Sequence, residues 1–144
     1  MSMYKNFKTD PDLERKGIVI DYGDFRVTTA RAGGANKKFA KLLAARTKPH
    51  ARAIQTDTMD PELALELLRR VYAEAIVLNW ETKVNGEFKV GIEPEDGSEK
   101  LLPFNSDNVE LTLTNLPDIF TDLQDQASKM SLYLSSLKEA NAGN

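Results

Sequence analysis

Few side chains in this sequence could perform chemistry. Its 144 residues include one histidine, His50, and no cysteine. A histidine metal site or a serine triad needs companions that the pattern does not supply, and cysteine chemistry is excluded. The many Asp and Glu residues of the second half form no evident catalytic pair, and we interpret them as a solvated acidic surface. A carboxylate site assembled only by the fold stays open. The sequence therefore predicts no catalytic residue, no metal and no cofactor.

A glycine-containing turn is the second chemical candidate. Gly33, Gly34 and two lysines precede a helical pattern, and the N-terminus of a helix favours anions. Neither a P-loop nor a GxGxxG pattern is present, so we interpret the stretch as a strand-to-helix turn with solvated lysines. Adjacent glycines permit unusual backbone angles, and Asn36 is expected to cap the helix. We assign Arg31, Gly33, Gly34 and Asn36 to this structural motif.

Charge is divided unevenly along the chain. Residues 1–56 hold 12 Lys and Arg against 5 Asp and Glu, whereas residues 57–144 hold 7 against 17, for a net charge of −3. Opposite poles favour head-to-tail contact between copies, or attract nucleic acid to the basic pole. The basic segment 26–52 has few aromatic residues for base stacking, and the whole chain is acidic. Nucleic acid is therefore not an expected partner, and a nucleic-acid-binding regulator that uses this segment is the alternative hypothesis.

The pattern of apolar residues predicts the elements that position these side chains. Two strands alternate over residues 18–22 and 25–30, joined by Gly23-Asp24, a type II′ hairpin signal. A helix follows Asn36 as far as about residues 46–48. A central core helix begins at Asp60-Pro61 and is expected to end near Asn79.

The second half of the chain is expected to carry one small hairpin and two helices. Asn85-Gly86 predicts an exposed hairpin or loop over residues 81–102. Ser106 is expected to cap a short helix. Pro117 then starts a last helix that runs to about Ala140.

The predicted fold class is α+β, with an N-terminal antiparallel β-hairpin packed on a mostly helical bundle of about four helices. We expect a single domain over residues 1–144, with a flexible arm at 1–16 and a frayed tail at 141–144.

An apolar stripe marks the last helix, with residues spaced alternately by three and four. Such a stripe packs either against the protein's own core or against a partner helix, and both interpretations stay open. Its members are Phe120, Leu123, Ala127, Met130, Leu134 and Leu137.

The N-terminal third resembles a known family. The stretch YKNFKTDPDLERKGIVIDYGDFRVTTARAGGANKKFAKLLAARTKP, residues 4–49, is similar to the tail assembly chaperones of long-tailed, siphovirus-type bacteriophages. Their gene lies just before the tape-measure gene. The segments VYAEAIVLNWE, LPF and NLPDIF add weaker likeness. The loop between Trp80 and Leu101 departs from the family pattern and is longer than usual.

The resemblance implies a non-enzymatic phage or prophage protein that multimerises, binds the tape-measure protein and keeps it soluble for tail-tube assembly. The tail-tube protein is a further candidate partner. We assign partner binding to the stripe residues Phe120, Leu123, Met130, Leu134 and Leu137. The expected location is the host bacterial cytoplasm and not the mature virion. No apolar run approaches the roughly 20 residues that span a bilayer, so no membrane contact is expected.

Overall fold

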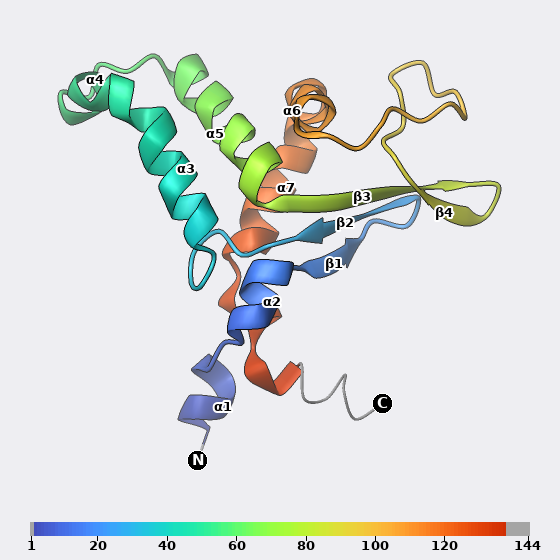
Figure 1. Cartoon of the computed structure of the whole chain (residues 1–144), viewed down its shortest axis with the longest axis horizontal. Helices are drawn as coiled ribbons and strands as arrows, with labels where there is room; N and C mark the ends of the chain where they lie inside the picture. The colour runs from blue at the N-terminus through green and yellow to red at the C-terminus, as the bar shows by residue number, and fades with distance from the viewer. Residues whose placement is uncertain (1, 138–144) are drawn as a thin grey trace.

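A four-stranded antiparallel sheet forms the centre of the computed structural model, which describes residues 2–137 (Figure 1). The strand order is β1-β2-β3-β4, so each strand pairs with its neighbour in the sequence. The strands are β1 (Ile18–Asp21), β2 (Phe25–Thr29), β3 (Val77–Val84) and β4 (Glu87–Val90). The α-helices are α1 (Met3–Phe7), α2 (Pro11–Lys16), α3 (Lys37–Thr47), α4 (Ala51–Gln55), α5 (Pro61–Ala75), α6 (Ser106–Asn115) and α7 (Pro117–Ser128). Two 3-10 turns, η1 (Lys48–His50) and η2 (Met130–Tyr133), complete the described elements.

The expected N-terminal hairpin is present. Asp21 pairs with Arg26 across the turn, and the Tyr22 N–H donates to the Phe25 carbonyl at 2.9 Å. Gly23 has a φ of 93°, a region that glycine enters without steric cost. The start of α5 is also as expected, because the Asp60 side chain accepts from the Glu62 N–H at 3.2 Å, directly before the helix.

Strands β3 and β4 differ from the expected fold. Helix α5 ends at Ala75 rather than near Asn79, and β3 begins at Val77. β3 is a central strand whose Trp80 lies opposite Val27 of β2, and Trp80 is buried. The predicted Asn85-Gly86 hairpin exists, and it joins this central strand to the edge strand β4. The α+β class is confirmed, but residues 2–137 form seven α-helices beside a four-stranded sheet rather than a bundle of about four helices.

The core lies between the sheet and α5, α6 and α7. Phe25 stacks between Tyr22 and Trp80, with ring centroids 4.7 and 5.4 Å away. Tyr72 of α5 meets the Phe120 ring edge-on at 5.4 Å. Such aromatic pairs add to the free energy gained by burying their apolar area. The hydrophobic cluster thus joins the hairpin to the helices that follow it.

The last helix is shorter than predicted. Helix α7 ends at Ser128, Lys129 is extended, and η2 follows, so the expected continuous helix to Ala140 is wrong within the described residues. Tyr133 gives the physical reason, because its buried hydroxyl donates to the Thr29 carbonyl of β2 at 2.9 Å. The residues expected as a frayed tail, 141–144, lie outside the described residues.

The N-terminal segment, expected as a flexible arm, forms α1 and α2. The Asp10 side chain caps α2 by accepting from the Asp12 and Leu13 N–H groups at 2.8 and 3.1 Å. Thr9 pairs with Leu134 in an isolated β-bridge, which ties this segment to the C-terminal part of the chain. At α6 the capping side chain is Asn105, which accepts from the Asn108 N–H at 2.8 Å, and not the expected Ser106.

Candidate partner-binding surface

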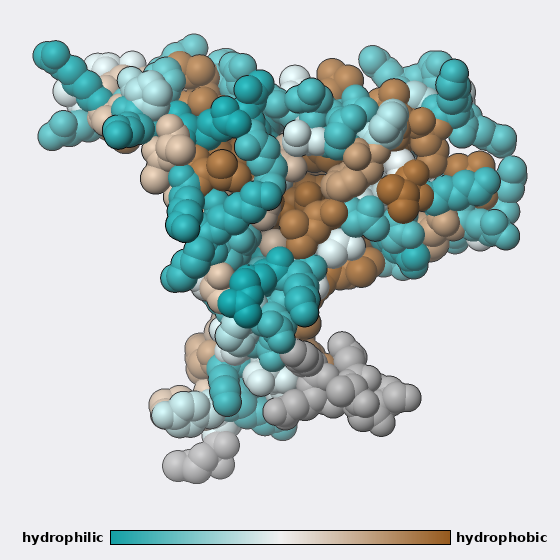
Figure 2. All heavy atoms as spheres, viewed as in Figure 1, coloured by the Kyte–Doolittle hydropathy of each residue, from teal (hydrophilic) through white to brown (hydrophobic). Residues whose placement is uncertain are grey.

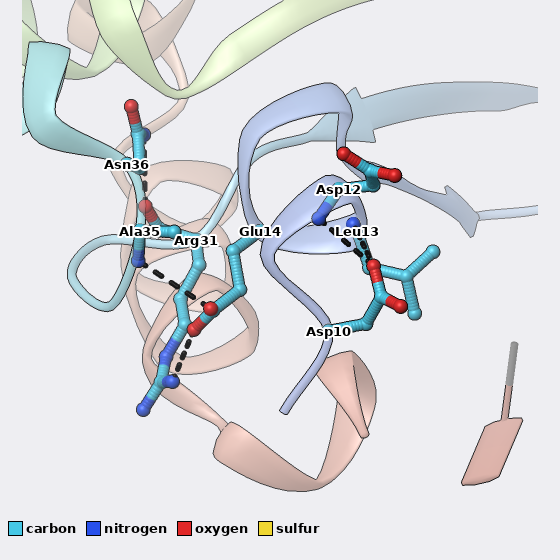
Figure 3. A network of polar contacts seen from close by, with 7 residues as sticks. All are labelled: Asp10, Asp12, Leu13, Glu14, Arg31, Ala35 and Asn36. Atoms are coloured by element: carbon cyan, nitrogen blue, oxygen red, sulfur yellow. Dashed lines mark hydrogen bonds and ion pairs between the residues drawn. The ribbon is translucent and has the colours of Figure 1, made fainter. Parts of the chain in front are cut away.

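The predicted turn motif is organised by a residue that sequence analysis did not single out, Glu14 of α2. Its buried carboxylate accepts from the Arg31 Nη1 at 2.5 Å and from the Ala35 N–H at 3.4 Å (Figure 3). A charge that is removed from water needs a partner of opposite charge and further hydrogen bonds, and this site supplies both. Glu14 therefore fixes α2 against the turn that leads into α3.

Asn36 does not cap α3, which corrects the prediction. Its side chain is buried, and the Nδ2 donates to the Arg31 carbonyl at 2.9 Å and to the Ala75 carbonyl at 3.1 Å. The Ala75 carbonyl is one of those that the end of α5 leaves without a partner inside the helix. Asn36 thus links the turn to the end of α5.

The two glycines of the motif have different roles. Gly34 has a φ of 55°, and a Cβ on this residue would overlap the Glu14 carboxylate. Gly33 has a φ of 143°, and a Cβ there would meet no atom within 4 Å. The structure therefore brings Arg31, Gly34 and Asn36 together around Glu14, whereas Gly33 contributes only its backbone conformation.

Beyond this turn, the chain forms a projecting helical arm, which we define as residues 37–68 from α3 to the first half of α5 (Figure 1). Phe39 and Leu68 pack against the core at its base. None of the arm's residues is buried, although it contains many apolar side chains. Those that are half-buried or exposed beyond its base include Leu42, Leu43, Ile54, Met59, Leu63, Leu65 and Leu67.

Figure 2 shows apolar side chains between α3 and α5 on the visible face of the arm. Two of the large apolar side chains of the arm are exposed, Ile54 at 47% and Leu65 at 40%. The other large apolar side chains of the arm are half-buried, and α3 and α5 contact each other.

The arm also carries most of the basic segment. Arg26 and Arg31 lie before it and pair with Glu81 and Glu14, and Arg46 pairs with Glu74. The remaining basic residues of the segment are exposed, and none of them forms an ion pair within the part of the chain that the structure describes. They are Lys37, Lys38, Lys41, Lys48 and Arg52.

The predicted partner-binding stripe does not lie on one surface. Phe120 and Leu123 are buried in the core. Met130 and Leu134 are half-buried in the segment after α7. Leu137 is 41% exposed, so the stripe divides between core and surface at the end of α7.

Leu137 lines a groove beside the edge strand β1. We call this surface, formed by Leu13, Gly17, Ile18, Val19, Leu132 and Leu137, the C-terminal groove. Val19 is also exposed there. Of the predicted residues, Leu137 thus remains the best placed to contact a partner.

Among the described residues, no group of three or more His, Asp or Glu side chains is placed to hold a metal ion. No helix within residues 2–137 combines the length and apolar character needed to cross a membrane. The surface features that stand out are apolar faces and charged patches.

The chain is an α+β protein with a projecting helical arm. The family model described as YdaY prophage protein matches residues 34–144. This match covers more than half of the chain, and the chain belongs to the YdaY prophage protein family. The phage or prophage origin expected from the sequence is thereby confirmed. No curated protein and no solved structure matches the chain.

Proposed function

We propose that this prophage protein is a tail assembly chaperone that binds a tape-measure protein and keeps it soluble until the tail tube assembles. The observation that carries the proposal is the helical arm, whose apolar side chains are left unburied by the rest of the chain. The similarity of residues 4–49 to tail assembly chaperones and the membership in a prophage family support it.

The arm suits a helical partner. Two adjacent helices with an apolar face between them accept a third amphipathic helix, whose apolar residues recur every three or four positions. A long tape-measure helix with such a stripe would aggregate if the stripe stayed exposed. Helix α3 has 11 residues and is therefore about 16 Å long. One copy covers only a few turns of a partner helix, so a long partner needs many copies.

Covering a partner in this way is a non-enzymatic role. It takes place in the host bacterial cytoplasm, and the protein leaves before the virion is complete. The tail-tube protein, which polymerises around the tape measure, is a second candidate partner for the same surface.

Co-expression with a tape-measure protein tests the proposal. The soluble fraction of the tape measure is expected to rise in the presence of this protein. The double substitution Ile54→Glu and Leu65→Glu places charges on two exposed arm residues and should remove this effect without unfolding the protein. Val90→Glu, at an exposed position on β4, is the matched control and should retain it.

Leu137→Glu separates the two candidate surfaces. A loss of solubilisation with this variant alone would move the contact from the arm to the C-terminal groove. If the tape measure is equally soluble with and without the wild-type protein, the chaperone proposal is wrong.

A nucleic-acid-binding regulator is the second candidate function, favoured by the five exposed basic residues of the arm. Phosphate contacts make affinity fall steeply with salt. The charge reversals Lys37→Glu and Lys41→Glu should then abolish binding to DNA or RNA at low salt. Wild-type protein that binds neither nucleic acid at low salt would exclude this function.

A further inference from the structure

Helix α1 exposes an unusual amount of apolar surface. Met3 is 64% exposed, Tyr4 74% and Phe7 68%, and α1 buries none of its residues. Residues three and four positions apart lie on the same side of a helix, so these three side chains form one patch. Lys5 lies within the helix and Lys8 directly follows it, so positive charge flanks the patch. Large exposed apolar patches mark interaction sites.

The backbone after α1 is bonded to the segment that follows α7. The Ser135 N–H donates to the Lys8 carbonyl at 2.8 Å, and the Asp10 N–H donates to the Tyr133 carbonyl at 2.8 Å. Figure 1 shows α1 at the N-terminal end of the molecule, far from α6 and from the loop that precedes it. The patch of one copy is therefore not positioned to reach the α6 region of the same copy.

A groove of complementary character lies beside α6. Leu111 and Leu116 are each 50% exposed, and with Leu102 they give the groove an apolar lining. Glu93 and Glu95 stand at its rim on the preceding loop. The groove is partly open and has a volume of about 310 Å³, at the lower end of the range for ligand pockets, so it accommodates individual side chains rather than a whole helix. We call these five residues the acidic groove.

We propose that α1 of one copy docks in the acidic groove of a second copy. Tyr4 and Phe7 would cover Leu111 and Leu116, while the two lysines face the two glutamates across the contact. Charge complementarity selects this occupant, because residues 2–8 carry two lysines and no acid, and residues 93–99 carry four acids and no base. Complementary charge favours the correct partner and disfavours copies in other orientations.

The contact joins two different surfaces, so it is heterologous. Each added copy presents one unoccupied α1 and one unoccupied groove, and association continues into a ring or an open helical array. The inference does not rest on the proposed chaperone function, because it concerns this chain alone.

Paired charge reversals in the purified full-length protein test the contact. One variant carries Lys5→Glu and Lys8→Glu, and the other carries Glu93→Lys and Glu95→Lys. Each variant alone has like charges on both surfaces and should associate at least tenfold more weakly than wild type in sedimentation experiments at low salt. A one-to-one mixture restores opposite charges at every contact and should recover wild-type association. Circular dichroism verifies that both variants are folded.

Two controls separate this contact from a general charge effect. Phe7→Ser keeps all charges and should weaken association by removing apolar area. Lys37→Glu with Lys38→Glu changes the net charge by the same amount on α3 and should leave association unchanged. The inference is overturned by a wild-type monomer at every concentration, by a mixture that stays dissociated, or by either control behaving in the opposite way.

Discussion

The carboxylate of Glu14 occupies the space that a side chain on Gly34 would need. These residues are 20 positions apart, on α2 and on the turn before α3. The contact explains why this position of the turn requires glycine for two reasons, a left-handed backbone and a close approach by a buried charge.

Gly34→Ala should therefore destabilise the protein more than its backbone angles alone require. Gly97 is the matched control, with a φ of 73° and no atom within 4 Å of an added Cβ. We expect Gly97→Ala to cost about 1–2 kcal/mol, the penalty of a left-handed residue. Gly34→Ala should cost roughly 1–3 kcal/mol more, because the Glu14 carboxylate loses its hydrogen bonds. Chemical denaturation measures both, and equal losses would show that the turn tolerates the shift.

A double substitution isolates the effect of the overlap between the Glu14 carboxylate and a Cβ on residue 34. In protein that already carries Glu14→Ala, Gly34→Ala should cost only the backbone term, so the two substitutions are not additive. Additive losses would contradict the assigned contact.

Glu14→Gln should destabilise the fold because Arg31 loses the charge of its partner. Removing one member of a buried ion pair costs about 3 kcal/mol or more, and the partial exposure of Arg31 places the expected loss at the lower end. Glu62→Gln on the exposed side of α5 is the control and should change stability by less than about 0.5 kcal/mol. Thermal and urea unfolding provide the comparison, and a neutral Glu14→Gln would mean that the network contributes no stability.

Turn residues and helix-start residues in the sequence correctly predicted where two elements begin or end. Gly23-Asp24 located the first hairpin, and Asp60-Pro61 located the start of α5. The end of α5 was missed because Ile76 and Val77 continue its apolar pattern, and a short apolar run fits a helix or a buried strand equally well. Residues 77–84 form a strand because Trp80 pairs with Val27, a residue distant in the sequence.

Long-range contacts also account for the missed parts of the site. Nothing near Glu14 in the sequence distinguishes it from a solvated helix residue, because its partner Arg31 lies 17 positions away. Asn36 has the residue type of a helix cap, but its side chain donates a hydrogen bond to the Ala75 carbonyl of α5. The apolar pattern of the arm does not show which side of each helix the core covers.

Alkaline pH should weaken the fold through Tyr22. Burial, and then the hydrogen bond that its hydroxyl donates to Asp122 at 2.5 Å, raise the pKa of Tyr22 well above its usual value of 10.0. The neutral phenol is thus favoured in the folded state. The contribution of Tyr22 to the free energy of unfolding is complete below about pH 10 and is lost as pH rises toward the folded-state pKa.

Tyr22→Phe tests this pH dependence. At neutral pH the variant should lose about 1.5–3 kcal/mol, the net value of a hydrogen bond to a charged group. Above pH 10 the free energy of unfolding of the variant should fall less steeply than that of wild type. Denaturation curves at a series of alkaline pH values measure the slopes, and parallel slopes would show that Tyr22 ionises equally in both states.

The apolar stripe divides at the end of α7 into a buried part and an exposed part. Leu123 is fully buried, whereas Leu137 is partly exposed, although the sequence places both in one continuous pattern. Leu123→Glu introduces a charge into the core without a partner and should unfold the protein. Leu137→Glu should change the unfolding temperature by only a few degrees, because its charge remains in contact with water. Circular dichroism and thermal unfolding compare the variants. If both unfold the protein, Leu137 belongs to the core and cannot serve as a partner contact, and if neither does, the placement of Leu123 is wrong.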